Sequence, residues 1–213
     1  GKYWSVNESG IYTDLLRVFI RNGDKVYIVS PIEKRENKKE QIIDEDHAKI
    51  LKVKTGNIQK TNIIEKGIST LLIESQFKRA IKKYFKDVRF DLVLFPTPPI
   101  TFVNVVKYIK KRDNAKAYLM LKDIFPQNAV DIGLLCKTGL KGLIYWYFRK
   151  KEKELYGVSD QIGCMSQANV DYIMKHNPEI DSEKVGICPN SIEMQDMSFL
   201  PNERIAIRQK YNI

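Results

Sequence analysis

The chain has 213 residues, of which 43% are hydrophobic and 29% are charged, and its formal net charge is +10. This composition is typical of a globular protein, and no stretch approaches the ~18 consecutive apolar residues of a membrane span, so no membrane-spanning helix is expected. The basic excess favours a phosphate-bearing partner such as nucleic acid, anionic lipid or an activated nucleotide, although an ordinary solvated lysine-rich surface accounts for it equally well.

Past residue 10 the hydrophobic period alternates between that of a helix and that of a strand. The first part of the chain predicts, in order, a helix, a strand, a charged loop, a second strand and a long helix, over residues 11–22, 25–30, 33–47, 50–53 and 63–85. The inner stripe of the long helix is expected to comprise Leu71, Leu72, Phe77, Ile81 and Phe85.

The second part continues the alternation. Strands are predicted at 91–95, 117–121, 161–165 and 185–188, and the helices between them at 98–111, 139–156 and 167–176. Thr97 is expected to cap the first of these helices with Pro98 at its first position, and Ser166 to cap the last. Strands that alternate with helices imply βαβ crossovers. We therefore predict an α/β fold of three layers, with a parallel sheet between helices.

In an open parallel sheet, ligands bind beyond the carboxyl ends of the strands. The polar residues predicted to follow the strands are Ser30-Pro31, Pro96-Thr97-Pro98, Lys122-Asp123, Ser166-Gln167 and Pro189-Asn190-Ser191. The Lys122-Asp123 pair could bind hydroxyl groups or orient a nucleophile, or Asp123 could simply cap the following turn. The loop Asn7-Glu8-Ser9-Gly10 likewise either caps the first helix or offers N–H groups to a phosphate or sugar.

Several site chemistries lack the residues they need. Cys136, Cys164 and Cys188 have no Cys-x-x-Cys spacing, so neither a disulfide framework nor a zinc site is expected and a cytoplasmic setting is favoured. His47 and His176 are the only histidines, and neither is expected to be catalytic. There is no glycine-rich dinucleotide fingerprint and no Walker loop. No metal or cofactor site is therefore predicted in this chain.

The helix over residues 140–156 is predicted to have two different faces. The face expected to meet the core comprises Leu140, Leu143, Ile144, Tyr147, Phe148 and Leu155. The opposite face is expected to carry Tyr145, Trp146, Arg149 and Lys153. Aromatic rings interleaved with cations are typical of a helix that lies on an anionic membrane surface, and an ordinary solvated face is the alternative.

An ordered set of segments carries a resemblance to a known family. The segments are GIYTDLLRVFIRNGDKVYIVSP, FDLVLFPTPP, LMLKDIFPQNAVDIGLL, KKEKELYGVSDQIGCMSQANVDYI and KVGICPNSIE. Together they resemble the amino-terminal, Rossmann-like domain of a family 4 glycosyltransferase of the two-domain GT-B architecture, in the bacterial subgroup that makes surface polysaccharides and O-antigens. The likeness covers almost the whole chain.

The resemblance implies a retaining transferase that moves a sugar from a nucleotide donor to a lipid-linked saccharide acceptor, working at the inner face of the cell membrane. Asp123 is then the expected acceptor contact or base. The positions that match the cleft between the two domains are Glu8, Ser9, Gly10, Thr97, Pro98, Lys122, Gln127, Ser166 and Asn190. The nucleotide sugar is expected to bind through the second domain, and no nucleic acid partner is implied.

The sequence also departs from the family pattern. Members usually open with an apolar strand, which this sequence lacks unless KYWSV replaces it, and the paired glutamates of the donor-binding domain are absent. We therefore expect residues 1–196 to form the acceptor-side domain and 197–213 to be a linker to a donor-binding domain. This part alone is expected to be inactive. Two other functions stay open, namely a non-catalytic module that binds lipid headgroups or nucleic acid, and half of a sugar-nucleotide epimerase.

Overall fold

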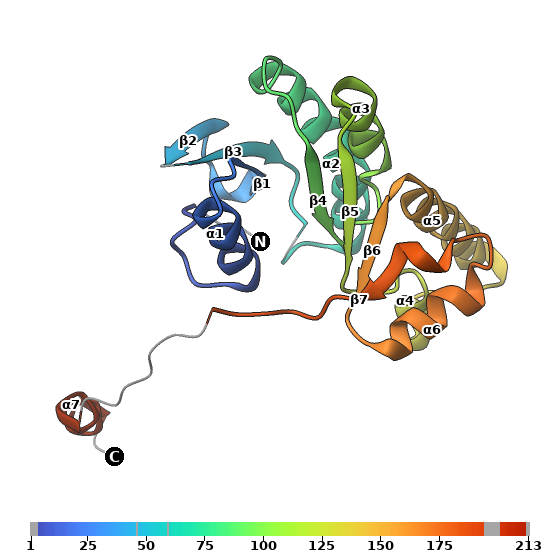
Figure 1. The fold of residues 1–213 in the computed structure, drawn as a ribbon. Helices are drawn as coiled ribbons and strands as arrows, with labels where there is room; N and C mark the ends of the chain where they lie inside the picture. Colours follow the sequence, from blue (N-terminus) through green and yellow to red (C-terminus); the bar gives the residue numbers. More distant parts are fainter. Residues whose placement is uncertain (1–3, 46, 59, 194–200, 212–213) are drawn as a thin grey trace.

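The computed structural model describes residues 4–45, 47–58, 60–193 and 201–211 (Figure 1). The helices are α1 (Ile11–Arg21), α2 (Ile63–Tyr84), α3 (Val103–Asp113), α4 (Gln127–Asp131), α5 (Gly139–Val158), α6 (Gln167–His176) and α7 (Pro201–Tyr211). The strands are β1 (Val26–Glu33), β2 (Gln41–Glu45), β3 (Ala48–Thr55), β4 (Leu92–Pro96), β5 (Lys116–Leu121), β6 (Gln161–Cys164) and β7 (Val185–Ile187). Short 3-10 turns, η1 (Lys34–Glu36) and η2 (Ser182–Lys184), complete the described elements.

Four strands form a wholly parallel sheet in the order β4-β5-β6-β7. Helices α3, α5 and α6 accompany it, and α3 packs against both α2 and α5 (Figure 1). The buried cluster on this sheet includes Leu119 of β5, Leu155 of α5 and Ile162 of β6. This arrangement confirms the prediction of an α/β fold with a parallel sheet between helices.

The remaining strands form a second, smaller sheet in the order β1-β3-β2. β1 and β3 are parallel, and β2 pairs with β3 in the antiparallel direction. The prediction that residues 33–47 are a loop is therefore wrong for β2. This short charged strand lies at the sheet edge, where Asp44 pairs with Lys49 at 2.9 Å, and charge on an edge strand opposes pairing with further chains.

Helix α2 packs between the smaller sheet and α3. Its first turn is capped by Asn62, whose side-chain oxygen accepts a hydrogen bond from the main chain of Glu65 at 2.8 Å. Phe77, Ile81 and Phe85 are buried as predicted. Leu71 and Leu72 are each 49% exposed, so their predicted place in the inner stripe is wrong. The buried face of α2 instead runs through Ile73, Phe77, Ala80 and Ile81.

Two further features bear on the domain organisation. Helix α7 lies within the segment expected to be a linker. Within the described part of the chain, β1 and β4 each pair with a single neighbouring strand, so each leaves one edge open.

None of the described helices combines the length and the apolar character that crossing a membrane requires.

Candidate functional site

The carboxyl ends of β4, β5, β6 and β7 lie along one edge of the parallel sheet. The strands are in register, with Leu121 opposite Cys164 in β6 and Cys164 opposite Ile187 in β7. The residues that follow the strands therefore emerge together. This edge holds Thr97, Pro98, Lys122, Asp123, Ser166 and Asn190.

Ser30 and Pro31 do not lie at a strand end, so their predicted place at the edge is wrong. β1 continues to Glu33, and Ser30 is buried inside the smaller sheet. The hydroxyl oxygen of Ser30 accepts a hydrogen bond from the buried ammonium of Lys52 at 3.0 Å, and this ammonium also lies 4.3 Å from the centre of the Trp4 ring. Ser30 thus accommodates a buried charge rather than facing a ligand.

Thr97 holds the turn that follows β5. Its buried hydroxyl oxygen accepts hydrogen bonds from the main-chain N–H of Lys122 at 3.1 Å and of Asp123 at 3.4 Å. The same hydroxyl donates to the carbonyl oxygen of Asp123 at 3.3 Å. Thr97 does not cap a helix and Pro98 does not begin one, because α3 starts at Val103 after its N-cap Phe102. The predicted cap is therefore wrong, and the hydroxyl serves the Lys122-Asp123 turn instead.

The Lys122-Asp123 turn carries the two charges that the sequence places at the edge. Lys122 is half-buried and the Asp123 side chain is exposed. Within the described residues neither side chain forms an ion pair, so the two charges do not neutralise each other. An exposed carboxylate on a main chain fixed by Thr97 can accept hydrogen bonds from the hydroxyl groups of a bound sugar.

The aromatic-proline step after Asp123 anchors the turn on the helix layer. The Phe125 ring contacts the Phe148 ring of α5 edge to face, with centroids 5.1 Å apart. Pro126 is buried and forms the N-cap position of α4. Gln127, the first residue of α4, donates a hydrogen bond to Asp131 at 2.6 Å, so its side chain is directed along the helix.

Ser166 caps α6 as predicted. Its hydroxyl oxygen accepts a hydrogen bond from the main chain of Asn169 at 3.4 Å and donates to the Asn169 side chain at 2.8 Å. Asn190 is exposed beyond β7, and the main-chain bond from Cys188 to Cys164, 2.7 Å long, extends the strand pairing towards it. Both polar side chains therefore remain accessible at the sheet edge.

A tyrosine and a glycine pack beneath this edge. Burial, with a hydrogen bond to Cys188, raises the pKa of Tyr118 to about 12, so its hydroxyl stays neutral. A Cβ atom at Gly163 would lie 2.5 Å from that hydroxyl oxygen and 2.6 Å from the Cβ of Cys188. A glycine at position 163 therefore leaves room for the contact between the Tyr118 hydroxyl and Cys188.

The loop before α1 is held by internal hydrogen bonds. The carboxylate of Glu8 accepts the main-chain N–H groups of Trp4 at 2.9 Å and Ser5 at 3.2 Å. Gly10 occupies the N-cap position, and its N–H donates to the Asp14 carboxylate at 3.1 Å. Ser9 is exposed. Gly10 therefore occupies the capping position that was one of the two roles predicted for this loop. The Glu8 side chain does not cap α1, because it bonds to the main chain of Trp4 and Ser5.

A charged cluster that the sequence analysis missed joins this loop to the segment after β7. Asp14 accepts hydrogen bonds from the guanidinium of Arg17 at 2.6 Å and from the main chain of Glu193 at 3.0 Å. Arg17 and Arg21 donate to the Glu193 carboxylate at 3.1 and 2.5 Å. The i, i+3 spacing of Asp14 and Arg17 is visible in the sequence, but nothing in it indicates the third partner.

These contacts favour the charged forms of both carboxyl groups. The pKa of Asp14 is lowered, chiefly by the hydrogen bond from the Glu193 main chain and then by that from Gly10. The pKa of Glu193 is lowered by the hydrogen bonds from Arg21 and Arg17. The cluster thus holds residues 190–193 and the loop at 8–10 in a fixed relation through α1.

Helix α5 presents a different face to solvent from the predicted one. Tyr145 is only 6% exposed, and Arg149 donates hydrogen bonds to Glu152 at 2.5 Å and to Asn177 at 2.7 Å, so neither belongs to an outer surface. Trp146 is exposed as predicted, and Lys153 pairs with Glu179 at the surface. The contacts of Arg149 with the end of α6 turn this side of α5 inward.

The exposed side of α5 is apolar. Leu140 is 84% exposed, and four more large apolar side chains on the same helix are exposed with it. We call this set the α5 apolar face: Leu140, Leu143, Ile144, Trp146 and Tyr147. The prediction that these leucines, Ile144 and Tyr147 face the core is wrong, while Phe148 and Leu155 pack inward as predicted.

Comparison with solved structures identifies proteins of similar fold. No family model matches the sequence, and no curated protein matches it. One similar solved structure, described as "Trehalose-6-phosphate from E. coli bound with UDP-2-fluoro glucose", has a TM-score of 0.65 and 9% identity over 100% of this chain and 53% of its own. A second, described as an OtsA apo structure, has a TM-score of 0.60 and 9% identity over 91% of this chain and 48% of its own.

The chain thus spans about half the length of each matched structure. At 9% identity this likeness establishes the fold alone. The chain has the Rossmann-like α/β architecture of one half of a GT-B protein.

Proposed function

We propose that this chain is the acceptor-side half of a retaining glycosyltransferase, which moves a sugar from a nucleotide donor to a lipid-linked saccharide in surface-polysaccharide or O-antigen synthesis. The observation that carries the proposal is the match of the whole chain to half of a structure whose description names a bound nucleotide sugar, UDP-2-fluoro glucose. The ordered family resemblance of the sequence supports the same activity, and it is the basis for the lipid-linked acceptor.

The sheet edge supplies the groups that an acceptor site needs. Asp123 is an exposed carboxylate on a turn that Thr97 fixes, and Lys122, Ser166 and Asn190 emerge along the same edge. We assign Asp123 to an acceptor hydroxyl, which it would hold by accepting a hydrogen bond. The rate gain of such a site comes from positioning the two substrates and from stabilising developing charge. The nucleotide sugar would bind largely through a second half.

The domain organisation follows from the same proposal. Residues 1–196 would form the acceptor-side domain and residues 197–213 would lead to the donor-binding half. The open edges of β1 and β4 support the expectation of one more strand, because an unpaired strand edge is available for pairing with a further strand.

The experiment uses the complete protein with both halves. Transfer is assayed from a panel of radiolabelled nucleotide sugars to lipid extract, with wild type and the Asp123→Asn variant. We expect one sugar to be transferred, and kcat/KM to fall about 100-fold or more in Asp123→Asn if the carboxylate acts in the transition state. Asp87→Asn, which alters an exposed carboxylate after α2, is the control and should retain full activity.

Inactivity with every donor would contradict the transferase. Epimerisation of the nucleotide sugar without transfer would favour an epimerase half. Full activity of Asp123→Asn would reject the site assignment while leaving the transferase in place.

A lipid-linked acceptor requires contact with a membrane, and the α5 apolar face is the surface that supports this. Five large apolar side chains project from it, and the exposed Lys137 and Lys150 lie on either side in the sequence. Apolar side chains that enter the interface beside cations on anionic headgroups are the pattern of a peripheral membrane helix.

Vesicle co-sedimentation tests this contact. Binding to anionic vesicles should fall in Leu143→Ser and Trp146→Ser, and it should be weak on neutral vesicles. Leu72→Ser, which alters a leucine on α2 that is 49% exposed, is the control. Equal binding by all three variants would reject the α5 apolar face as the membrane contact.

A further inference from the structure

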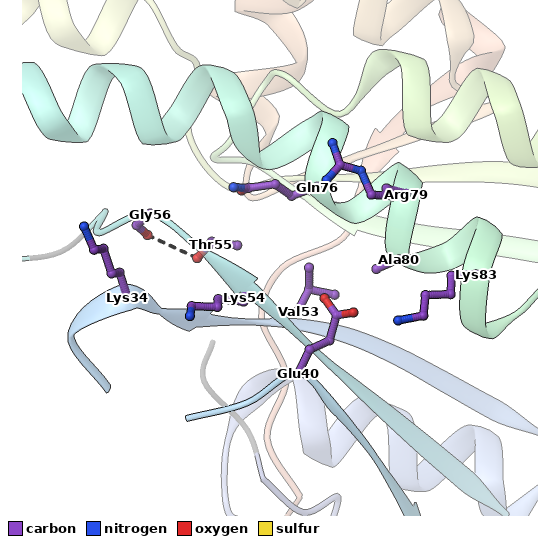
Figure 2. A pocket seen from close by; sticks show the side chains of 10 residues that line it. All are labelled: Lys34, Glu40, Val53, Lys54, Thr55, Gly56, Gln76, Arg79, Ala80 and Lys83. Atoms are coloured by element: carbon purple, nitrogen blue, oxygen red, sulfur yellow. Dashed lines mark hydrogen bonds between the residues drawn. The ribbon is translucent and has the colours of Figure 1, made fainter. Parts of the chain in front are cut away.

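A cavity of about 530 Å³ opens between the end of β3 and helix α2 (Figure 2). Its size lies within the usual ~300 to 1,000 Å³ of small-molecule sites. Four cations from three elements line it, namely Lys34 of η1, Lys54 of β3, and Arg79 and Lys83 of α2. It shares no residue with the sheet edge described above.

The positive charge of this cavity is only partly neutralised. Glu40 is the one carboxylate among the lining residues, and Figure 2 shows it pointing towards the ammonium of Lys83. The pKa of Lys83 is raised by its hydrogen bond to the Tyr84 hydroxyl and also by Glu40. Within the described residues, Lys34, Lys54 and Arg79 form no ion pair. A concave surface with this excess of cations attracts anions.

An acceptor group accompanies the cations. Gln76 lines the cavity, and its side-chain carbonyl oxygen is buried and has no hydrogen-bond partner among the described residues. Buried polar atoms are almost always paired, so an unpaired one at a cavity wall points to a missing donor. A carbonyl oxygen can accept only from an N–H or O–H group. The hydroxyl groups of a sugar are donors of this kind.

Part of the cavity wall is formed by buried residues of β3 and α2. Val53 and Ala80 are buried at its base. The hydroxyl of Thr55 donates to the carbonyl oxygens of Ile32 at 3.3 Å and Gly56 at 3.1 Å, which fixes the end of β3. This part of the cavity wall is therefore fixed by the fold.

We propose that this cavity binds a saccharide that carries a phosphate or carboxylate group. The anionic group lies among Lys54, Arg79 and Lys83, and a sugar hydroxyl donates to the carbonyl oxygen of Gln76. This site is independent of the proposed sugar transfer, because it uses different residues and requires only binding.

Calorimetric titration of the protein at fixed ionic strength tests the proposal with four probes: a hexose phosphate, a hexuronic acid, pyrophosphate and an uncharged hexose. We expect one of the two anionic sugars to bind more tightly than pyrophosphate and far more tightly than the hexose. The tighter of the two identifies the anionic group. Equal affinity for pyrophosphate and both anionic sugars would reject a saccharide site, and tightest binding of the hexose would reject the role of the cations.

Variants separate the two parts of the site. Gln76→Leu should weaken the anionic sugar about tenfold, the effect of one lost hydrogen bond, and leave pyrophosphate unchanged. Arg79→Gln and Lys83→Gln should weaken both ligands about tenfold or more. Lys82→Gln is the matched control on the same helix, because its ammonium lies over the Tyr108 ring, 4.9 Å from its centre, and not in the cavity.

Thermal unfolding of each variant confirms that it is folded before titration. Equal weakening by Lys82→Gln and Lys83→Gln would show binding to a diffuse basic surface and would overturn the proposal. An effect of Gln76→Leu on pyrophosphate as large as on the sugar would reject the hydroxyl contact. Either result can occur whether or not the complete protein transfers sugar.

Discussion

The carboxylate of Asp14 in α1 accepts a hydrogen bond from the main-chain N–H of Glu193, 179 residues later in the chain, at 3.0 Å. The Glu193 carboxylate in turn accepts hydrogen bonds from Arg17 and Arg21 of the same helix. The segment that leaves the sheet edge after β7 is therefore fixed on α1. In the proposed transferase this contact holds two parts of the acceptor side, the loop at 8–10 and the segment after β7, in one arrangement.

The first prediction concerns pH. Because the pKa values of Asp14 and Glu193 are lowered in the folded state, both groups stabilise it above their unfolded pKa of about 4, and this contribution is lost as the pH falls through the folded values. We expect the free energy of unfolding to fall between about pH 5 and pH 3, and to fall less in Asp14→Asn. Urea unfolding at a series of pH values measures the difference. Asp87→Asn is the control, and an identical pH dependence in wild type and Asp14→Asn would contradict the role of the cluster.

The second prediction concerns the turn that positions Asp123. Thr97→Val removes the buried hydroxyl that pairs with two main-chain N–H groups and one carbonyl oxygen. We expect the free energy of unfolding to fall by about 1 to 3 kcal/mol, because buried donors lose their acceptor. Thr97→Ser keeps the hydroxyl and should lose less. Urea unfolding compares the two, and equal losses would show that the methyl group of Thr97 matters rather than its hydrogen bonds.

Local sequence patterns are sufficient to predict the order of the main helices and strands. Strands such as β4 and β5 are short apolar runs, and Ser166 precedes α6 in a sequence that permits a cap, so each could be read from its own residues. β2 could not be predicted in this way, because Gln41–Glu45 is a short polar segment that forms a strand only by pairing with β3. The role of Thr97 could not be predicted either, since its hydroxyl bonds to a turn 25 residues later in the chain and not to the next helix.

The faces of α5 show why burial was harder to predict than helix formation. Apolar side chains occur all around the helix between residues 143 and 148, so two different stripes fit its periodicity. The hydrogen bonds from Arg149 to the His176 carbonyl oxygen and to Asn177 join the inward stripe to the end of α6, a contact that the sequence of α5 does not indicate. The contact between Asp14 and Glu193 also depends on the tertiary fold, because no sequence spacing predicts a contact between residues so far apart.

A third prediction tests the orientation of α5. Leu155 is fully buried in the main core, whereas Leu140 is 84% exposed on the same helix. We expect Leu155→Ala to lower the free energy of unfolding by about 2 to 5 kcal/mol through the lost contacts and the cavity that is left. Leu140→Ala should change it by no more than about 0.5 kcal/mol. Comparable losses in the two variants, measured by urea unfolding, would contradict the assignment of the exposed face.

A fourth prediction concerns the buried carboxyl group of Glu152, which accepts hydrogen bonds from Tyr156 at 2.6 Å and from Arg149 at 2.5 Å. Burial raises its pKa in spite of these partners. A raised folded pKa stabilises the folded state fully below the unfolded value of about 4.3, and that contribution is lost as the pH rises through the folded value. We expect Glu152→Gln to lower the free energy of unfolding by about 1 to 3 kcal/mol, with a loss that becomes smaller as the pH rises from 4 to 7.

Glu154, two residues along α5, is the matched control for this pH dependence. It pairs with Lys151 at 2.9 Å near the surface, and the hydrogen bond from Lys151 lowers its pKa. The pH dependence of Glu154→Gln should therefore have the opposite sign to that of Glu152→Gln. Its total loss should stay within about 0.5 kcal/mol, because solvent screens a surface pair. A loss that grows with pH in both variants would show that Arg149 outweighs burial at Glu152 and that the carboxyl group is charged throughout this range.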